Sequence, residues 1–232
     1  MSHFKPIYVV FQEGVPNVYV QAAMRGMTSV VNLLGVRSGI PVHNFGVWRE
    51  PGWRQMGSLV SEMSVDWYIQ QGRGQRRNQI VIEPILQAFA QEVWQQHQPH
   101  YDVLVLHEDL HPGGGVKGVN FILGCTFRGL ASVVSCHQFA RMEVDESVRA
   151  ACMETTVMHE IGHLFGLCPK TWVDAMDQEA FGGPHCTNRC IMRQRVAVDG
   201  WLELTRDRLE HPPFCQRCYV GVQQLLLEGE VS

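Results

Sequence analysis

Residues 148–168, VRAACMETTVMHEIGHLFGLC, contain the pattern on which the interpretation of the whole chain depends. The residues just before it, Asp145-Glu146-Ser147, offer an N-cap and an acidic first turn for a helix. Near its end, Gly166 is suited to ending a helix, because glycine adopts a left-handed conformation without strain. We therefore expect a helix over Val148–Leu167 that carries two histidines and a glutamate.

Within this helix, residues 159–163 form the pattern HExxH as His159-Glu160-Ile161-Gly162-His163. Residues four apart lie on one face of a helix, so His159 and His163 can bind the same metal ion. Glu160 can project toward a water molecule on that ion and act as a general base. The alternative that these residues leave open is a buried helix whose histidines make ordinary hydrogen bonds.

A catalytic zinc ion usually has three protein ligands, so a third must come from outside the helix. Gly166 lies three residues after His163, which resembles the metzincin signature HExxHxxGxxH, but position 169, where its last histidine would stand, is a proline. The next histidine opens the run His185-Cys186-Thr187-Asn188-Arg189-Cys190-Ile191-Met192, and a Cys-x-x-Cys pair follows at Cys215 and Cys218. These motifs resemble the archaemetzincins, a branch of the metzincin clan of zinc metallopeptidases, over about residues 100–220.

The resemblance implies roles for these residues. His159, His163 and His185 would bind a catalytic zinc ion, with Glu160 as the general base and Met192 in the apolar Met-turn beneath the metal. A second, structural zinc ion would be bound by four thiolates, those of Cys186, Cys190, Cys215 and Cys218. Four thiolates form a closed tetrahedral zinc site, and the spacings within the two cysteine pairs lie in the usual range. Metal binding would explain how an irregular C-terminal segment stays folded.

The main departure from the family pattern concerns the third zinc ligand. An insertion of 16 residues, Pro169–Pro184, separates the end of the helix from His185. Alternative ligands lie within the insertion and beyond it: Asp174, Asp177, Glu179, Glu203 and His211. A carboxylate ligand normally stands on a following helix in zinc peptidases that lack the glycine after HExxH, so we favour His185.

Composition sets the broad class of the protein. The chain has 232 residues, 45% of them apolar and 18% charged, as in ordinary globular proteins. Its net charge of −4 gives no overall basic surface for nucleic acid. Neither a secretory signal nor an apolar run of transmembrane length is present, so we expect a cytoplasmic protein, without membrane contact, that is monomeric. In a reducing compartment, five of eight cysteines clustered in the last third favour metal binding over disulfides.

Before the HExxH helix, strand and helix patterns alternate. We expect strands at Ile7–Phe11, Ile40–Val47 and Tyr101–Leu106, and helices at Val15–Leu34 and Gln79–Gln96. Residues 48–77 read as irregular, with a short helix around Leu59–Ile69. A hairpin joined at Arg128-Gly129 would pair Val119–Phe127 with Leu130–Ser135. This order predicts a mixed α/β fold with a metzincin-like twisted mixed sheet and packed helices.

We expect one metzincin-like catalytic domain over residues 1–232. Residues 1–167 would form an upper α/β subdomain that ends in the active-site helix. Residues 168–232, in which no clear period is found, would form a small irregular lower subdomain held by the four-cysteine zinc site.

Three further features carry weaker signals. The segment His107–His111 is dense in metal-ligand residue types, and we interpret it as a polar loop near the cleft. Leu130–Ser135 is interpreted as an edge strand, either a plain sheet edge or one along which an extended peptide aligns. Cys168 is interpreted as a small, half-buried side chain rather than a fifth metal ligand or a labile thiol.

Together these observations predict a zinc-dependent metallopeptidase that hydrolyses peptides or proteins, with two zinc ions per chain. The resemblance suggests short peptides or free N-termini as substrates, hence an aminopeptidase-like activity. The rival hypothesis is a catalytically inactive zinc-structured protein that binds a peptide or a partner. Glu160 argues against the rival, because a structural site needs no general base beside its first ligand.

Overall fold

The structure is a computed structural model that describes residues 5–33, 39–47, 65–74, 76, 78–113, 119–168, 176–178, 184–195 and 197–228. Its elements are, in chain order, β1 (Ile7–Phe11), α1 (Asn17–Leu33), β2 (Val42–Gly46), α2 (Val65–Gln71), β3 (Ile80–Val81), α3 (Ile82–Ala90), α4 (Val93–His97), β4 (Tyr101–Leu106), β5 (Leu110–His111), β6 (Gly124–Phe127), β7 (Ala131–Ser135), α5 (His137–Ala140), α6 (Glu146–Leu164), β8 (Met176–Gln178), β9 (Pro184–Cys186), α7 (Val198–Glu210) and α8 (Gln216–Glu228).

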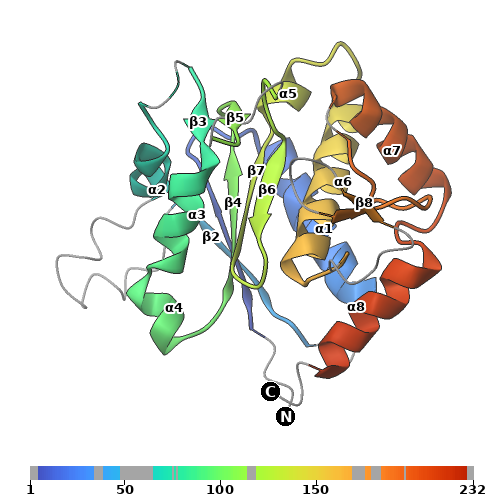
Figure 1. Ribbon diagram of the computed structural model, residues 1–232. Coiled ribbons are helices and arrows are strands. Elements are labelled where there is room, and N and C mark those ends of the chain that lie inside the picture. The colour runs from blue at the N-terminus through green and yellow to red at the C-terminus, as the bar shows by residue number, and fades with distance from the viewer. Residues whose placement is uncertain are drawn as a thin grey trace.

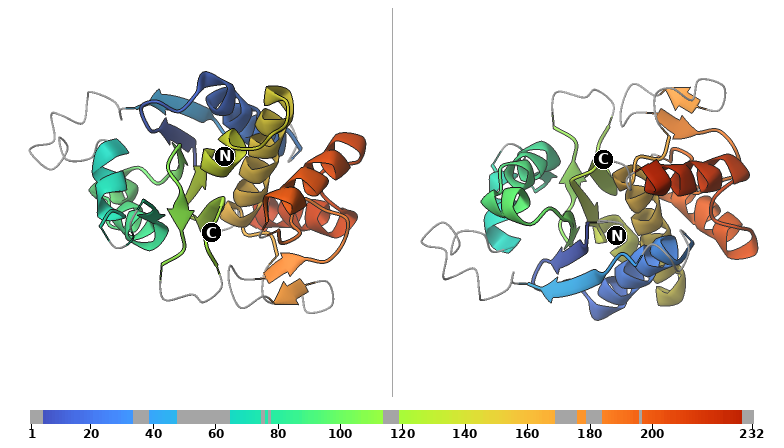
Figure 2. Two further views of the ribbon diagram at one scale, coloured as in Figure 1. Left: turned by 90° about the horizontal axis from the view of Figure 1, so that it is seen from above. Right: turned by 90° about the horizontal axis from the view of Figure 1, so that it is seen from below.

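A five-stranded sheet in the order β2-β1-β4-β7-β6 forms the centre of the fold (Figure 1). The pairs β1–β2, β1–β4 and β4–β7 are parallel, and only β6 is antiparallel to its neighbour β7. Helices cover both faces, with α2 and α3 on one and α1 and α6 on the other (Figure 2). The predicted mixed α/β sheet with packed helices is therefore confirmed.

Strand β4 shows how the sequence creates two apolar layers. Its side chains alternate between the faces of the sheet, as in any strand. Val103 and Val105 belong to the buried cluster that includes residues of α1 and α6, whereas Leu104 and Leu106 belong to the cluster with α2 and α3. A strand buried on both faces is apolar without alternation, which is why Tyr101–Leu106 is readily recognised from sequence. Within the described ranges, no helix has both the length and the apolar character needed to cross a bilayer.

Helix α6 begins two residues before the start and ends three residues before the end of the predicted range Val148–Leu167. Asp145 is the N-cap residue, although its side chain makes no capping hydrogen bond, and Glu146 begins the helix. At the other end, the Gly166 amide donates to the His163 carbonyl oxygen and the Leu167 amide donates to that of Gly162, both at 2.9 Å. This is the Schellman arrangement, and it requires the positive φ of +90° that Gly166 adopts.

The predicted edge strand is wrong. Residues 130–135 were expected at the edge, but β7 lies inside the sheet, paired in parallel with β4 and antiparallel with β6. The hairpin at Arg128-Gly129 forms as expected, and β6 is the edge strand. Pairing with β4 decides the order, because a continuous run of five fully buried residues in β7 suits an interior strand.

The predicted helix at residues 79–96 is also wrong in part. Ile80 and Val81 form β3, paired with β5, and Glu92 interrupts the segment between α3 and α4. The Ile80 amide donates to the Asp109 carbonyl oxygen, and the Val81 amide donates to the Gly72 carbonyl oxygen. Backbone pairing with other segments therefore overrides the helical pattern of the sequence. The helix expected around Leu59–Ile69 is found as α2 from Val65, and residues 59–64 lie outside the described residues.

The C-terminal segment was expected to be irregular, and this is wrong for much of its length. Two helices of 13 residues, α7 and α8, occupy much of it, and α7 packs beside α6 (Figure 1). In α7 only Trp201, Leu204 and Thr205 are buried. So short an apolar stripe, which includes a threonine, gives little helical period in the sequence.

The contact between α1 and α6 leads to a prediction about stability. At Gly26, a Cβ atom would lie 2.8 Å from the Glu154 carbonyl oxygen and 3.2 Å from Val157 Cβ. Because the nearest atom is backbone, we expect overpacking in Gly26→Ala to lower the free energy of unfolding by about 1–3 kcal/mol. This loss opposes the gain of ~1 kcal/mol that alanine gives over glycine within a helix. Urea unfolding measures this. The control is Thr28→Ala at an exposed position of α1, and a Gly26→Ala protein more stable than this control would contradict the packing argument.

Candidate metal centres and active site

Three histidines from two separate elements converge on one point. His159 and His163 lie four residues apart on α6, and His185 lies in β9. The His163 Nε2 atom is 3.1 Å from His159 Nε2 and 3.1 Å from His185 Nε2. His159 and His185 are each only 3% exposed, whereas His163 is partly exposed.

The hydrogen bond of His159 determines which of its ring nitrogens is free to bind a cation. Its Nδ1 atom is 2.6 Å from the Ile191 carbonyl oxygen. Because a carbonyl oxygen only accepts, Nδ1 carries the proton and Nε2 presents a lone pair toward the other two rings. Burial lowers the pKa of His159 to about 3, assisted by the neighbouring His185. Burial and the other two imidazoles also hold the pKa of His163 well below its usual value, so both rings are neutral.

The spacing of the three nitrogens fits a zinc ion. Zinc–nitrogen distances of about 2.0–2.1 Å in tetrahedral geometry place the nitrogens of two ligands about 3.3 Å apart. The two observed Nε2–Nε2 distances of 3.1 Å are close to this value. Neutral imidazoles with converging lone pairs form the donor set that a divalent cation requires.

Glu160 lies beside the three histidines in a buried position. Its side chain is on the α6 surface next to β6, and only 6% of the residue is exposed. Burial raises the pKa of the carboxyl group to about 7, while a hydrogen bond from Thr126 opposes this rise. The Thr126 hydroxyl donates to Glu160 Oε2 at 2.6 Å. The carboxyl group is thus positioned by the edge strand of the sheet.

These side chains line a cleft of about 260 Å³ between the edge strand and the C-terminal elements. Its walls come from the segment that contains β6, from α6, from β9 and from the start of α7: Val119, Phe121, Ile122, Leu123, Gly124, Cys125, Thr126, Arg128, His159, Glu160, His163, Leu167, Cys168, Pro184, His185, Gln194, Arg195 and Trp201. The three imidazoles and the Glu160 carboxyl group are accessible from this one cleft.

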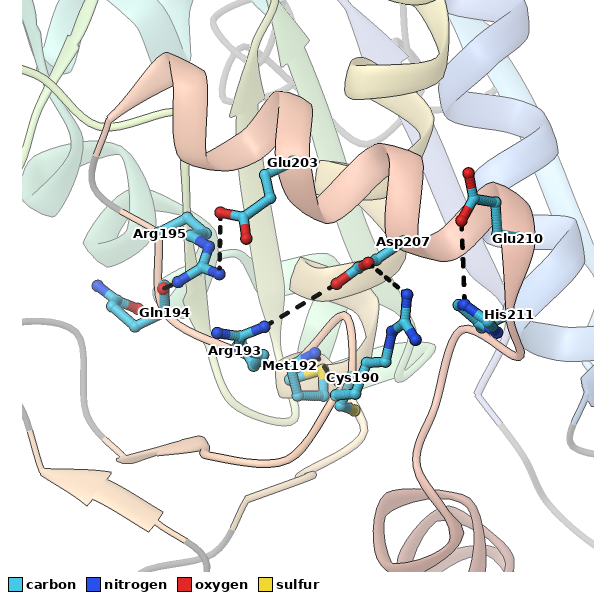
Figure 3. A network of polar contacts seen from close by, with 10 residues as sticks. Cys190, Met192, Arg193, Gln194, Arg195, Glu203, Asp207, Glu210 and His211 are labelled. Carbon is cyan, nitrogen blue, oxygen red and sulfur yellow. Dashed lines mark hydrogen bonds and ion pairs between the residues drawn. The ribbon is translucent and has the colours of Figure 1, made fainter.

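The loop after Cys190 contacts the two elements that carry the histidines, α6 and β9. Met192 is fully buried, and a Cβ atom on Gly162 of α6 would collide with its sulfur. The Cys186 amide donates to the Met192 carbonyl oxygen at 2.8 Å, which links the loop to β9. Beyond Met192, Arg193 forms an ion pair with Asp207 and Arg195 one with Glu203, so α7 holds the loop in place (Figure 3).

Four cysteines form a second cluster. The sulfur atoms of Cys186, Cys190, Cys215 and Cys218 all lie within 4.8 Å of one another. Cys186 Sγ is 3.7 Å from Cys215 Sγ, close to the separation of about 3.8 Å that tetrahedral zinc–sulfur bonds of about 2.3 Å produce. The Met192 backbone amide donates to Cys190 Sγ, and the Asn188 side-chain amide donates to Cys215 Sγ. Hydrogen bonds from Cys190 and Cys218 lower the pKa of Cys186.

The alternative third ligands do not join the histidine cluster where the structure describes them. Glu203 is paired with Arg195, and its side chain is 65% exposed. His211 is exposed beside Glu210 (Figure 3). Asp174 and Glu179 lie outside the described residues. The backbone of Asp177 pairs with His185 between β8 and β9, but its side chain is not among the described ones.

Two other sequence interpretations can be compared with the structure. The segment 107–111 is not a loop throughout, because Leu110 and His111 form β5. His111 is buried, accepts a hydrogen bond from the Gly113 amide at Nδ1 and contacts the Val119 carbonyl oxygen through Nε2, which explains it as a structural residue. Cys168 is 3% exposed, more buried than expected, and raises the pKa of the adjacent Cys218.

The structure gathers residues that sequence analysis did not select. The Trp201 ring packs edge-on against His159 at 5.2 Å between centroids, and its indole donates to the Arg195 carbonyl oxygen at 2.8 Å. In the sequence, Trp201 could have been selected only if residues 198–210 had been recognised as a helix. Gly124 and Thr126 contact Glu160. The period-two alternation of β6 places both on one face, but their contact with Glu160 is seen only in the structure.

A third buried cluster lies apart from the cleft, where α3 and α4 join β4. His100 Nε2 is 3.2 Å from Asp102 Oδ2 and 3.9 Å from Glu92 Oε2, and Gln95 donates to the same Asp102 oxygen at 2.9 Å. His100 also stacks on Tyr8 of β1, with 4.6 Å between ring centroids. These contacts fasten the start of β4 to the neighbouring strand and helices.

Comparisons with known proteins agree with the geometry. Residues 63–168 match the model of the metallo-peptidase family M12B, described as Reprolysin-like. No curated protein matches the chain in sequence. The crystal structure of archaemetzincin from Methanopyrus kandleri is similar over 97% of both chains, with a TM-score of 0.63 and 21% identity. A zinc-dependent peptidase from Methanocorpusculum labreanum is similar over 93% of this chain and 99% of its own, with a TM-score of 0.51 and 20% identity.

The family match covers the segment that ends with the HExxH helix, and the structural similarity extends over nearly the whole chain. The chain thus has the fold of an archaemetzincin, and its residues 63–168 match the model of a metallopeptidase family.

Proposed function

We propose that this protein is a zinc-dependent metallopeptidase in which His159, His163 and His185 bind the catalytic ion and Glu160 is the general base. The observation that carries the proposal is the position of a buried carboxyl group in the same cleft as three converging imidazoles. A purely structural metal site is closed by a fourth protein ligand, whereas three histidines leave one position open. The metallopeptidase family match and the fold support the same function.

The chemistry follows from this arrangement. His159, His163 and His185 would hold a zinc ion, which would supply a Lewis acid that makes the attacking water more acidic. Glu160 accepts a proton from the attacking water as its oxygen bonds to the scissile carbonyl carbon. Glu160 then gives this proton to the leaving nitrogen as the C–N bond breaks, so one water is consumed and the carboxylate is restored. No cysteine is required as a nucleophile.

The edge strand suggests how a peptide substrate would lie. Among the described residues, β6 pairs on one side only, with β7, and the residues of β6 from Gly124 to Thr126 line the cleft. An extended peptide can add to such an edge through backbone hydrogen bonds. We infer that a bound peptide lies along β6 with its scissile bond near the histidines. From sequence, peptide alignment was one of two alternatives for Leu130–Ser135, which contains the interior strand β7. Whether a free N-terminus is needed is measured by comparing a peptide with its acetylated form.

The four cysteines are proposed to bind a second, structural zinc ion. Cys186 directly follows His185, and one apolar cluster contains Cys186, Cys190 and Cys218 together with residues of α1 and α6. This continuity supports a single catalytic domain over residues 1–232, in which residues 168–232 form a lower part fastened by the second ion.

Replacing the general base gives the sharpest prediction from this site. We expect Glu160→Gln to lower kcat for peptide hydrolysis by about 100-fold or more, because the amide cannot accept the proton. The amide has nearly the size of the carboxyl group and is not a zinc ligand in this proposal, so zinc content is expected to remain that of the natural protein. Peptide cleavage assays with metal analysis by mass spectrometry measure both. Full activity of the Glu160→Gln protein would contradict the assigned role.

Metal content separates the two proposed sites. We expect about two zinc ions per purified chain, and one after either His159→Ala or Cys215→Ser, because each substitution removes a ligand of a different site. Cys136→Ala is the matched control, since this buried cysteine lies outside both clusters and both ions should remain. A single zinc ion that persists after His159→Ala but is lost after Cys215→Ser would indicate an inactive, zinc-structured protein instead.

A further inference from the structure

We propose that strand β6 positions the carboxyl group of Glu160, with Gly124 leaving the space for it and Thr126, backed by Ser132, holding one of its oxygens. This inference rests on the proposed function, because it assigns positioning residues to the same general base. The three residues come from the β6–β7 hairpin, whereas Glu160 belongs to α6, so the geometry of the base depends on how the edge of the sheet meets the helix.

Gly124 makes the close approach of strand and helix feasible. A Cβ atom at this position would lie 2.7 Å from Glu160 Oε1, 2.8 Å from its Cγ and 2.9 Å from its Cδ. Real Cβ contacts do not reach these distances, so any larger residue would displace the carboxyl group or the strand. Gly124 has no unusual φ angle in this structure, and the reason for glycine is therefore the space that Glu160 occupies.

Thr126 lies two residues further along β6 and thus on the same face as Gly124. Its Oγ1 atom is 2.6 Å from Glu160 Oε2 and 3.2 Å from the Glu160 carbonyl oxygen. An ionised carboxylate only accepts hydrogen bonds, so the threonine hydroxyl is the donor. A donor bonded to a charged acceptor in a buried site is among the stronger hydrogen bonds in proteins.

Ser132 completes the arrangement from the neighbouring strand. It is the cross-strand partner of Thr126 in the antiparallel pair, it is fully buried, and its Oγ atom is 2.7 Å from Thr126 Oγ1. Because the proton of Thr126 is directed at Glu160, the hydroxyl of Ser132 can donate to Thr126. The two hydroxyls then form a short hydrogen-bonded chain, in which Ser132 donates to Thr126 and Thr126 donates to Glu160.

The consequence is that only one carboxylate oxygen is available for proton transfer. Oε2 is held by Thr126, so Oε1 is the oxygen left to receive a proton from water in the cleft. A glutamate side chain has three rotatable bonds, and fixing it in advance removes an entropic cost that would otherwise fall on the reaction. The edge strand would therefore serve two purposes, aligning the substrate on its edge and holding the base on its face.

The test compares Thr126→Val, which keeps the shape of the side chain but removes the hydroxyl, with Thr126→Ser, which keeps the hydroxyl. We expect kcat of the zinc-loaded Thr126→Val protein to fall by about 10- to 100-fold with little change in KM, because a misplaced base affects the chemical step. Thr126→Ser should retain most of the activity. Zinc content and thermal stability are measured in parallel, and both should remain close to those of the natural protein.

Crystal structures of the zinc-loaded natural and Thr126→Val proteins provide a readout that does not depend on activity. We expect the Glu160 carboxyl group to leave its place beside β6 in the valine variant. Gly124→Ala should displace it from the other side and lower kcat in the same way. An unmoved carboxyl group, or an unchanged kcat, in the valine variant would overturn the inference. If the natural protein cleaves no peptide, the proposed function fails, and the carboxyl position still decides whether β6 holds Glu160.

Discussion

The architecture depends on bringing three imidazole nitrogens to one buried point. Helix geometry alone brings two of them together, because a spacing of four residues places His159 and His163 on the same face of α6. The third must come from a later segment, and so the helix has to end sharply. The Schellman turn at Gly166 provides this end, and β9 then brings His185 to within 3.1 Å of His163. Burial keeps His159 and His163 neutral, so a divalent cation suits the site better than protons do.

The two proposed metal centres support each other through the chain between them. Cys186 follows His185 directly, and Met192 in the loop from Cys190 to Met192 packs against Gly162 of α6. The Ile191 carbonyl oxygen in this loop accepts the hydrogen bond that orients His159. A closed metal site that fixes the cysteines would therefore also fix two imidazoles. His185 is fixed because it directly precedes Cys186, and His159 is fixed by its hydrogen bond to Ile191. On the opposite side, the Gly129 amide of the β6–β7 turn donates to the Leu164 carbonyl oxygen of α6, which joins the edge strand to the same helix.

Sequence and structure agree where local pattern dominates and differ where distant pairing decides. The buried run of β4, the hairpin turn at Gly129 and the end of α6 at Gly166 all have local signals. The order of β6 and β7 depends on which strand pairs with β4, and β3 depends on backbone bonds to residues far along the chain. Helix α7 was missed because its apolar face is short. The convergence of His185 with the α6 histidines was expected from motif resemblance, whereas the contacts of Thr126 and Trp201 required coordinates.

The most direct test of this account is anomalous X-ray diffraction at the zinc absorption edge from crystals of the protein purified without chelator. We expect one peak at about 2.0–2.1 Å from Nε2 of His159, His163 and His185, and a second at about 2.3 Å from the four cysteine sulfurs. The first ion should have a coordination position open to the cleft, and the second should have none. The account would be contradicted by the absence of a peak at the histidines, or by a first ion whose third ligand is a carboxylate such as Asp177 instead of His185.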